Sequence, residues 1–143
     1  MTAFFTPLPG IPELYFGGVF ERGIPGKERI VLKSLDLVNM GEFCLLVGFS
    51  QFGAANTATP FNNQFFWFGN GLVQKDEWIH VYTGRGKPSQ GVGTVSKEKI
   101  YSVYWGAKNT LFHQEQTTPL LLRFGGISLP AIDDTYSSNI ISE

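Results

Sequence analysis

Apolar residues occupy every second position over residues 42–49, and this segment is the clearest predicted strand of the chain. The alternating positions are Phe43, Leu45, Val47 and Phe49. A period of two residues places successive side chains on opposite faces of a sheet. We therefore expect Phe43, Leu45 and Val47 to face a core.

A second alternating segment, residues 78–84, has aromatic residues on the face that the core does not use. Ile79 and Val81 share one face, which we expect to be buried. The opposite face has three ring side chains in a row, namely Trp78, His80 and Tyr82. Such a row would form a stacking platform for a ligand or partner, unless a second layer covers it.

Shorter β-favouring segments, separated by turn-forming residues, account for most of the remaining chain. Further strands are predicted at residues 14–20, 28–37, 65–68, 99–105, 111–112 and 120–124. A β-bulge near Lys33-Ser34 would bring the apolar positions of residues 28–37 onto one face. Leu120, Leu122 and Phe124 are expected to point inward. Residues 50–63 and 83–96, rich in Gly and small polar residues, are predicted to be long loops.

This succession of short strands predicts an all-β fold, because no stretch of ten or more residues carries a helical period. The strands are expected to form an antiparallel β-sandwich of about seven to nine strands, with an antiparallel β-barrel as the alternative. Residues 14–129 would form this single domain. Residues 1–13 are predicted to be an extended arm rich in proline, and residues 130–143 a frayed tail.

Three groups of residues resemble the lamin-tail domain family in their order along the chain. The first is ERIVLK at residues 28–33, followed by a turn and the strand LLVG at residues 45–48. The second, WIHVYTGRG at residues 78–86, is similar to that family's strand ending in a V-x-T-G-x-G loop. The third comprises YWG at 104–106, LF at 111–112 and LLLRFGG at 120–126. The resemblance covers about residues 28–126 and implies an immunoglobulin-like β-sandwich with a non-catalytic binding role.

Composition and charge narrow the class of protein further. The chain has 143 residues, enough for one domain, with 15% aromatic and 16% charged residues. Such a composition excludes disorder for the body of the chain. The net charge of -1 gives no overall field toward nucleic acid or a membrane. A single cysteine, Cys44, excludes an intramolecular disulfide. Residues 1–10 do not have the pattern of a signal peptide, so a cytoplasmic location away from the membrane is expected.

Residues that could support catalysis are few. Only His80 and His113 could act as a histidine base, and no G-x-S-x-G sequence occurs. We therefore predict no enzymatic activity, no catalytic residue, no cofactor and no metal site. The alternative is a small hydrolase acting on a carbohydrate or phosphoester through Glu77 and His80, or through the loop at residues 84–87.

A local basic edge lies in the second half of the chain. Between residues 85 and 108 there are five basic residues and one acidic residue, a local net charge of +4. With the nearby aromatic residues this edge supports a third hypothesis, binding of single-stranded nucleic acid. No motif for specific nucleic-acid recognition occurs, and we expect a protein partner or self-association instead, with a glycan as the alternative ligand. The predicted binding residues are Trp78, His80, Tyr82, Arg85, Lys87, Tyr104 and Trp105.

Overall fold

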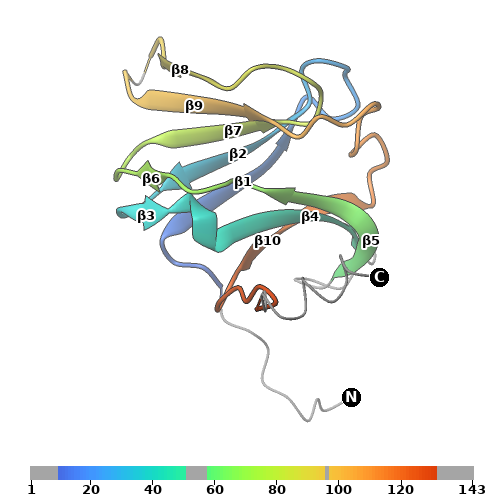
Figure 1. Cartoon of the computed structure of the whole chain (residues 1–143). Coiled ribbons are helices and arrows are strands. Elements are labelled where there is room, and N and C mark those ends of the chain that lie inside the picture. The colour runs from blue at the N-terminus through green and yellow to red at the C-terminus, as the bar shows by residue number, and fades with distance from the viewer. Residues whose placement is uncertain (1–9, 51–57, 96, 132–143) are drawn as a thin grey trace, which may run out of the picture.

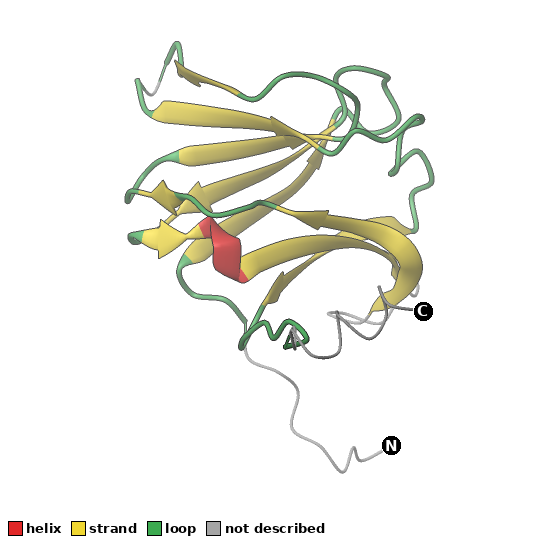
Figure 2. Cartoon of the chain, in the orientation of Figure 1, coloured by secondary structure: helices red, strands yellow, loops and turns green. Residues whose placement is uncertain are grey.

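The protein is built from short strands, as the sequence predicts. The computed structural model describes residues 10–50, 58–95 and 97–131. These residues contain ten strands and a single turn of 3-10 helix (Figure 2). In chain order they are β1 (Leu14–Phe20), β2 (Arg29–Ser34), β3 (Val38–Asn39), η1 (Met40–Glu42), β4 (Phe43–Ser50), β5 (Ala58–Trp67), β6 (Leu72–Val73), β7 (Trp78–Tyr82), β8 (Ser89–Val92), β9 (Lys99–Tyr104) and β10 (Thr117–Arg123).

The strands form two main sheets and a small ribbon (Figure 1). The larger sheet has the order β1-β2-β7-β9-β8, the smaller one β10-β4-β5, and β3 pairs with β6. This arrangement confirms an all-β sandwich. One pairing departs from the predicted antiparallel pattern, because β7 and β9 run parallel. The connection between them includes β8, which turns back and pairs with the far edge of β9.

The core lies between the two main sheets. It is formed by Ile30, Leu32, Ile79 and Val81 from the larger sheet, Phe43, Leu45 and Val47 from the smaller one, and Phe112 from the connection before β10. Each of these side chains is at most 2% exposed. The predicted inward faces of residues 43–47 and 79–81 are therefore confirmed.

The predicted inward face of β10 is wrong. Leu121 packs against the core, whereas Leu122 is 40% exposed and Leu120 lies on the same outer side as Leu122. Leu121 lies opposite Leu45 in the antiparallel pair, and opposite residues share a face. Phe124, also predicted to point inward, is half-buried and follows the end of the strand. A run of three leucines has no alternation from which the face could be assigned.

Four other local predictions also need correction. Residues 58–63 belong to β5 and residues 89–92 form β8, whereas both were predicted to be loop. Residues 111–112 form no strand. The irregularity predicted near Lys33-Ser34 lies instead in β1, between Phe16 and Gly18. Residues 51–57, and most of the predicted arm and tail, lie outside the described residues.

A fully buried carboxylate ties three segments together at one end of the sandwich. Glu28 is 1% exposed and accepts four hydrogen bonds. The donors are Gly23 N at 2.7 Å, Thr83 Oγ1 at 2.8 Å, Leu111 N at 2.7 Å and Phe112 N at 3.1 Å. A buried charge of this kind is tolerated only when it is fully hydrogen-bonded. Glu28 thus joins the turn after β1, the end of β7 and the connection before β10.

Arg22 also fixes the connection before β10. Its guanidinium donates to the carbonyls of Phe112, Gln114 and Thr117, at 3.1, 3.2 and 2.6 Å. The irregular segment before β10 is therefore fixed by side chains rather than by a sheet ladder. Within the described ranges, no helix has the length and apolarity needed to cross a membrane.

Candidate functional site

The outward side chains of the larger sheet form the surface that we call the outer face. Trp78, His80 and Tyr82 lie on it, half-buried, opposite to the core positions of β7, as the alternation predicts. The strand register brings neighbours beside them. The outer face includes Tyr15 and Phe20 from β1, Arg29, Val31 and Lys33 from β2, Trp78, His80 and Tyr82 from β7, and Ile100, Ser102 and Tyr104 from β9.

A shallow hollow lies at the centre of the outer face. Its volume is about 220 Å³, and its lining residues are Phe20, Arg29, Val31, Trp78, His80 and Ile100. Val31 is only 4% exposed, whereas Phe20 is 46% exposed. The hollow is thus lined mainly by apolar and aromatic side chains. Val31 is buried within it, whereas Phe20 is exposed beside it.

Cations lie over the rings of the outer face. The Arg29 guanidinium carbon is 5.8 Å from the ring centroids of both Phe20 and Tyr82. Lys33 Nζ is 5.1 Å from the centroid of Trp78. Distances within about 6 Å give a favourable cation–π interaction. One side of each of these three rings is therefore occupied by a positive charge.

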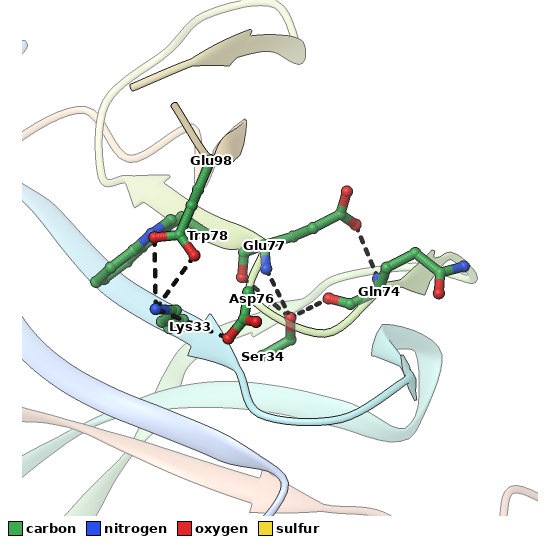
Figure 3. A network of polar contacts seen from close by, with 7 residues as sticks. All are labelled: Lys33, Ser34, Gln74, Asp76, Glu77, Trp78 and Glu98. Carbon is green, nitrogen blue, oxygen red and sulfur yellow. Dashed lines mark hydrogen bonds and ion pairs between the residues drawn. The ribbon is translucent and has the colours of Figure 1, made fainter. Parts of the chain in front are cut away.

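Glu98 fixes the tryptophan and the lysine in place (Figure 3). The Trp78 indole N–H donates to the Glu98 carboxylate at 3.1 Å, and Lys33 Nζ lies 3.3 Å from the same carboxylate. The hydrogen bond from Trp78 lowers the pKa of Glu98, and Lys33 lowers it further against the opposing effect of desolvation. Lys33 also lies 3.9 Å from Asp76. These contacts hold the Trp78 ring at the margin of the hollow.

The turn before β7 is fixed by Ser34, the last residue of β2 (Figure 3). Its buried hydroxyl donates to the carbonyls of Gln74 and Glu77 and accepts from the backbone N–H of Glu77 at 3.1 Å. Asp76 has a left-handed backbone (φ 67°), and its N–H donates to the Ser34 carbonyl at 2.9 Å. The position of Trp78, two residues later, is therefore set by a closed network of hydrogen bonds.

Glu77 and His80, the pair that a hydrolase would need, are not brought together. The Glu77 carboxylate accepts from the Tyr101 hydroxyl at 3.3 Å and lies 3.8 Å from Lys99 Nζ, on the inner side of the sheet. His80 lies on the outer face, and no carboxylate in the described part of the chain is hydrogen-bonded to it. Burial lowers the pKa of His80, and the charge of Arg29 lowers it further. Both effects favour the neutral imidazole over its protonated form.

Tyr104 joins the outer face by stacking on Tyr82. The two ring centroids are 5.3 Å apart, with the planes inclined by 19°. The loop after β7 lies against the Tyr104 ring at Gly86, where a Cβ atom would clash with the ring. Only glycine fits this close approach. The two tyrosines thus form a packed pair and leave no free platform between them.

The other three predicted residues lie elsewhere. Arg85 and Lys87 are exposed in the loop after β7. Arg85 lines a separate hollow with Gly26, Gly84, Ala107 and Lys108. Trp105 faces the interior, where its ring packs against Phe66 at a centroid distance of 5.5 Å. The structure therefore groups Trp78, His80, Tyr82 and Tyr104 and separates Trp105 from them.

Apart from Tyr104, sequence reasoning did not find the residues that other segments bring beside β7. Four of these residues make the ring, ion-pair and hydrogen-bond contacts of the site. They are Phe20, Arg29, Lys33 and Glu98. The first three become neighbours of β7 through the order β1-β2-β7, which no local pattern encodes. In the sequence, Glu98 stands out as the one acidic residue of the basic edge and as one of several carboxylates without a distinctive spacing. A signal for its role would have required the parallel pairing of β7 with β9.

Neither a metal centre nor a related protein assigns a function. Among the described residues, no three metal-ligating side chains of His, Cys, Asp or Glu come together. Cys44 is buried in β4, and burial raises the pKa of its thiol. No protein-family model, curated protein or solved structure matches the chain. The outer face is therefore the feature of the molecule that bears on its function.

Proposed function

We propose that this protein is a non-catalytic binding module that captures a protein partner on its outer face. The observation that carries the proposal is the apolar hollow between Phe20 and Trp78, with Arg29 and Lys33 fixed over its rings. Interface hot spots concentrate in Trp, Tyr and Arg residues near a desolvated pocket. An apolar side chain of a partner would fill the hollow, and its flanking acceptor groups would meet the two cations.

The chemistry of the rings favours a protein over the other ligands considered. A sugar or a base stacks on a free aromatic surface. Here Lys33 covers one side of Trp78, Arg29 covers one side of Tyr82, and Tyr82 and Tyr104 stack on each other. The hollow is better shaped for one apolar side chain than for a row of stacked rings.

A non-catalytic role is supported by the surroundings of His80. A histidine base is normally oriented by an acidic partner, whereas His80 has Arg29 as its charged neighbour. The resemblance to lamin-tail domains supports the same conclusion, and we propose that the sandwich is of that immunoglobulin-like type. Self-association through the outer face and a cytoplasmic location stay predictions.

The test compares capture of partner proteins by three forms of the purified chain. Phe20→Ala removes one wall of the hollow, and Leu72→Ala is the matched control, because Leu72 is an exposed apolar residue (66%) on β6, away from the outer face. We expect Phe20→Ala to weaken capture at least about 30-fold, as for a hot spot, while Leu72→Ala captures normally. Equal capture by both variants would contradict the proposal. Sedimentation of the same proteins shows whether the partner is a second copy.

A further inference from the structure

The strand β8 ends the larger sheet and has no neighbour on its far side among the described residues (Figure 1). All four of its residues are exposed. β8 pairs with β9 in an antiparallel register without a bulge. The far edge of β8 is thus a row of backbone groups facing solvent.

The hydrogen-bond pattern shows which groups these are. Gly93 N donates to the carbonyl of Glu98 at 2.9 Å, so this pair is of the hydrogen-bonded kind. Bonded and non-bonded pairs alternate along an antiparallel ladder. Gln90 and Val92 therefore occupy non-bonded pairs, and their N–H and C=O groups point away from β9. These four groups match what an added strand needs.

The edge lacks the devices that usually block strand addition. Edge strands are commonly protected by a charged residue, a proline or a bulge within the strand. Ser89–Val92 contains no charged residue and no proline, and Pro88 lies just before the strand. Short length is the one protective feature that β8 has. A short partner segment can therefore pair with it.

Basic residues without an ion-pair partner flank β8 along the chain. Arg85 and Lys87 precede β8, and Lys97 lies in the turn that follows it. None of these three has a carboxylate within ion-pair distance among the described residues. The segments on either side of β8 thus carry three positive charges that no ion pair neutralises.

We propose that β8 is a docking edge for an extended acidic segment of a partner protein, which adds to the larger sheet as a further strand. Main-chain hydrogen bonds to Gln90 and Val92 give the affinity, and the basic residues select for acidic side chains. A second copy of the chain would bring like charges together. A nucleic acid could meet the charges but could not form the ladder. This proposal rests on no contact of the outer face. Its failure would therefore leave the proposed function of the outer face unaffected, and the reverse is also true.

The direct test is a titration of the isotope-labelled protein, followed by NMR, with a decapeptide of alternating Thr and Glu. We expect saturable shifts of the backbone amides of Gln90 and Val92. The matched peptides are the same Thr–Glu sequence methylated on every backbone nitrogen, which has the same charge and no N–H groups, and alternating Thr and Lys. The methylated peptide should bind about tenfold or more weakly, since the hydrogen bonds to the carbonyls of Gln90 and Val92 are lost, and the Lys peptide should not bind. Absence of saturable shifts at millimolar Thr–Glu peptide, or equal binding of the methylated peptide, would overturn the proposal.

Two variants test the edge from the side of the protein. Gln90→Pro removes an outward N–H, whereas Gln90→Ala keeps it. The proline variant should bind the Thr–Glu peptide about three- to tenfold more weakly than the alanine variant. Replacing Arg85 and Lys87 by Ala should reduce the salt dependence of binding. Tighter binding of oligothymidylate than of the peptide would assign the basic edge to nucleic acid and overturn the proposal.

Discussion

Glu28→Gln is the substitution that most sharply tests how the sandwich is held together. The glutamine has nearly the same size as the glutamate, so packing is unchanged, but one acceptor oxygen becomes an NH2 donor. Both carboxylate oxygens accept two hydrogen bonds each, from Thr83 and Leu111 on one side and from Gly23 and Phe112 on the other. In either orientation the new NH2 faces a backbone N–H.

The cost can be worked out for the better orientation. With the NH2 group beside Thr83, the hydroxyl can turn and accept, but the N–H of Leu111 loses its acceptor, at about 1–3 kcal/mol. The remaining bonds lose the strength of a charged acceptor, about 1 kcal/mol each. A neutral amide is less costly to bury than a carboxylate, which offsets part of this loss. We expect a net decrease of about 2–4 kcal/mol, a large part of the 5–15 kcal/mol typical of a domain.

Urea denaturation measures this difference, and hydrogen exchange locates it. The amides of Leu111 and Phe112 should exchange faster in Glu28→Gln than in the wild type, because the connection before β10 is released. The control is Glu21→Gln, since Glu21 lies in the same turn with an exposed side chain and only a 3.5 Å ion pair. It should change stability by less than about 0.5 kcal/mol. A change that small in Glu28→Gln, with unaltered exchange, would refute the reasoning.

The remaining predictions concern the core, the loop after β7 and the histidine. Leu45→Ala should cost about 2–5 kcal/mol in urea denaturation, and Leu122→Ala less than about 1 kcal/mol; the reverse order would show that the faces of the smaller sheet are misassigned. Gly86→Ala should cost about 1–3 kcal/mol by overpacking, whereas Gly84→Ala, with open space around its Cβ, should be tolerated; equal thermal melting of the two would contradict this. The pKa of His80 is lowered below 6.5, so the unfolded chain binds the proton more readily, and stability should fall as the pH drops from 6.5 toward the lower native pKa. An NMR titration giving His80 an ordinary or raised pKa would contradict that prediction.

Local alternation predicted the faces of β4 and β7 correctly because it reports directly on which side chains meet the core. It failed for β10, where three consecutive leucines fit either face and the register with Leu45 decides. It missed β8, since Ser89–Val92 lacks the apolar alternation of a half-buried strand. Alternation of apolar residues thus identified the strands that face the core. It missed β8, whose place in the sheet depends on backbone pairing alone.

The candidate site was predicted in its β7 row and at Tyr104, and the rest was missed for a related reason. Trp78, His80 and Tyr82 are adjacent along one strand, so their shared face follows from the sequence. Their neighbours Arg29 and Phe20 come from other strands, and pairing between strands depends on the whole fold. Trp105 was wrongly predicted to be a binding residue. It directly follows Tyr104, the last residue of β9, and packs against the core, whereas Tyr104 points outward.

The most direct test of the outer face as a binding surface is site-specific photo-crosslinking in cells that produce the protein. Benzoylphenylalanine replaces Phe20 beside the hollow in one form of the chain, and Leu72 on β6 in the other; both natural side chains are exposed and apolar. We predict a crosslinked protein partner from position 20 and none from position 72. Equal crosslinking from both positions, or crosslinking from position 72 alone, would contradict it.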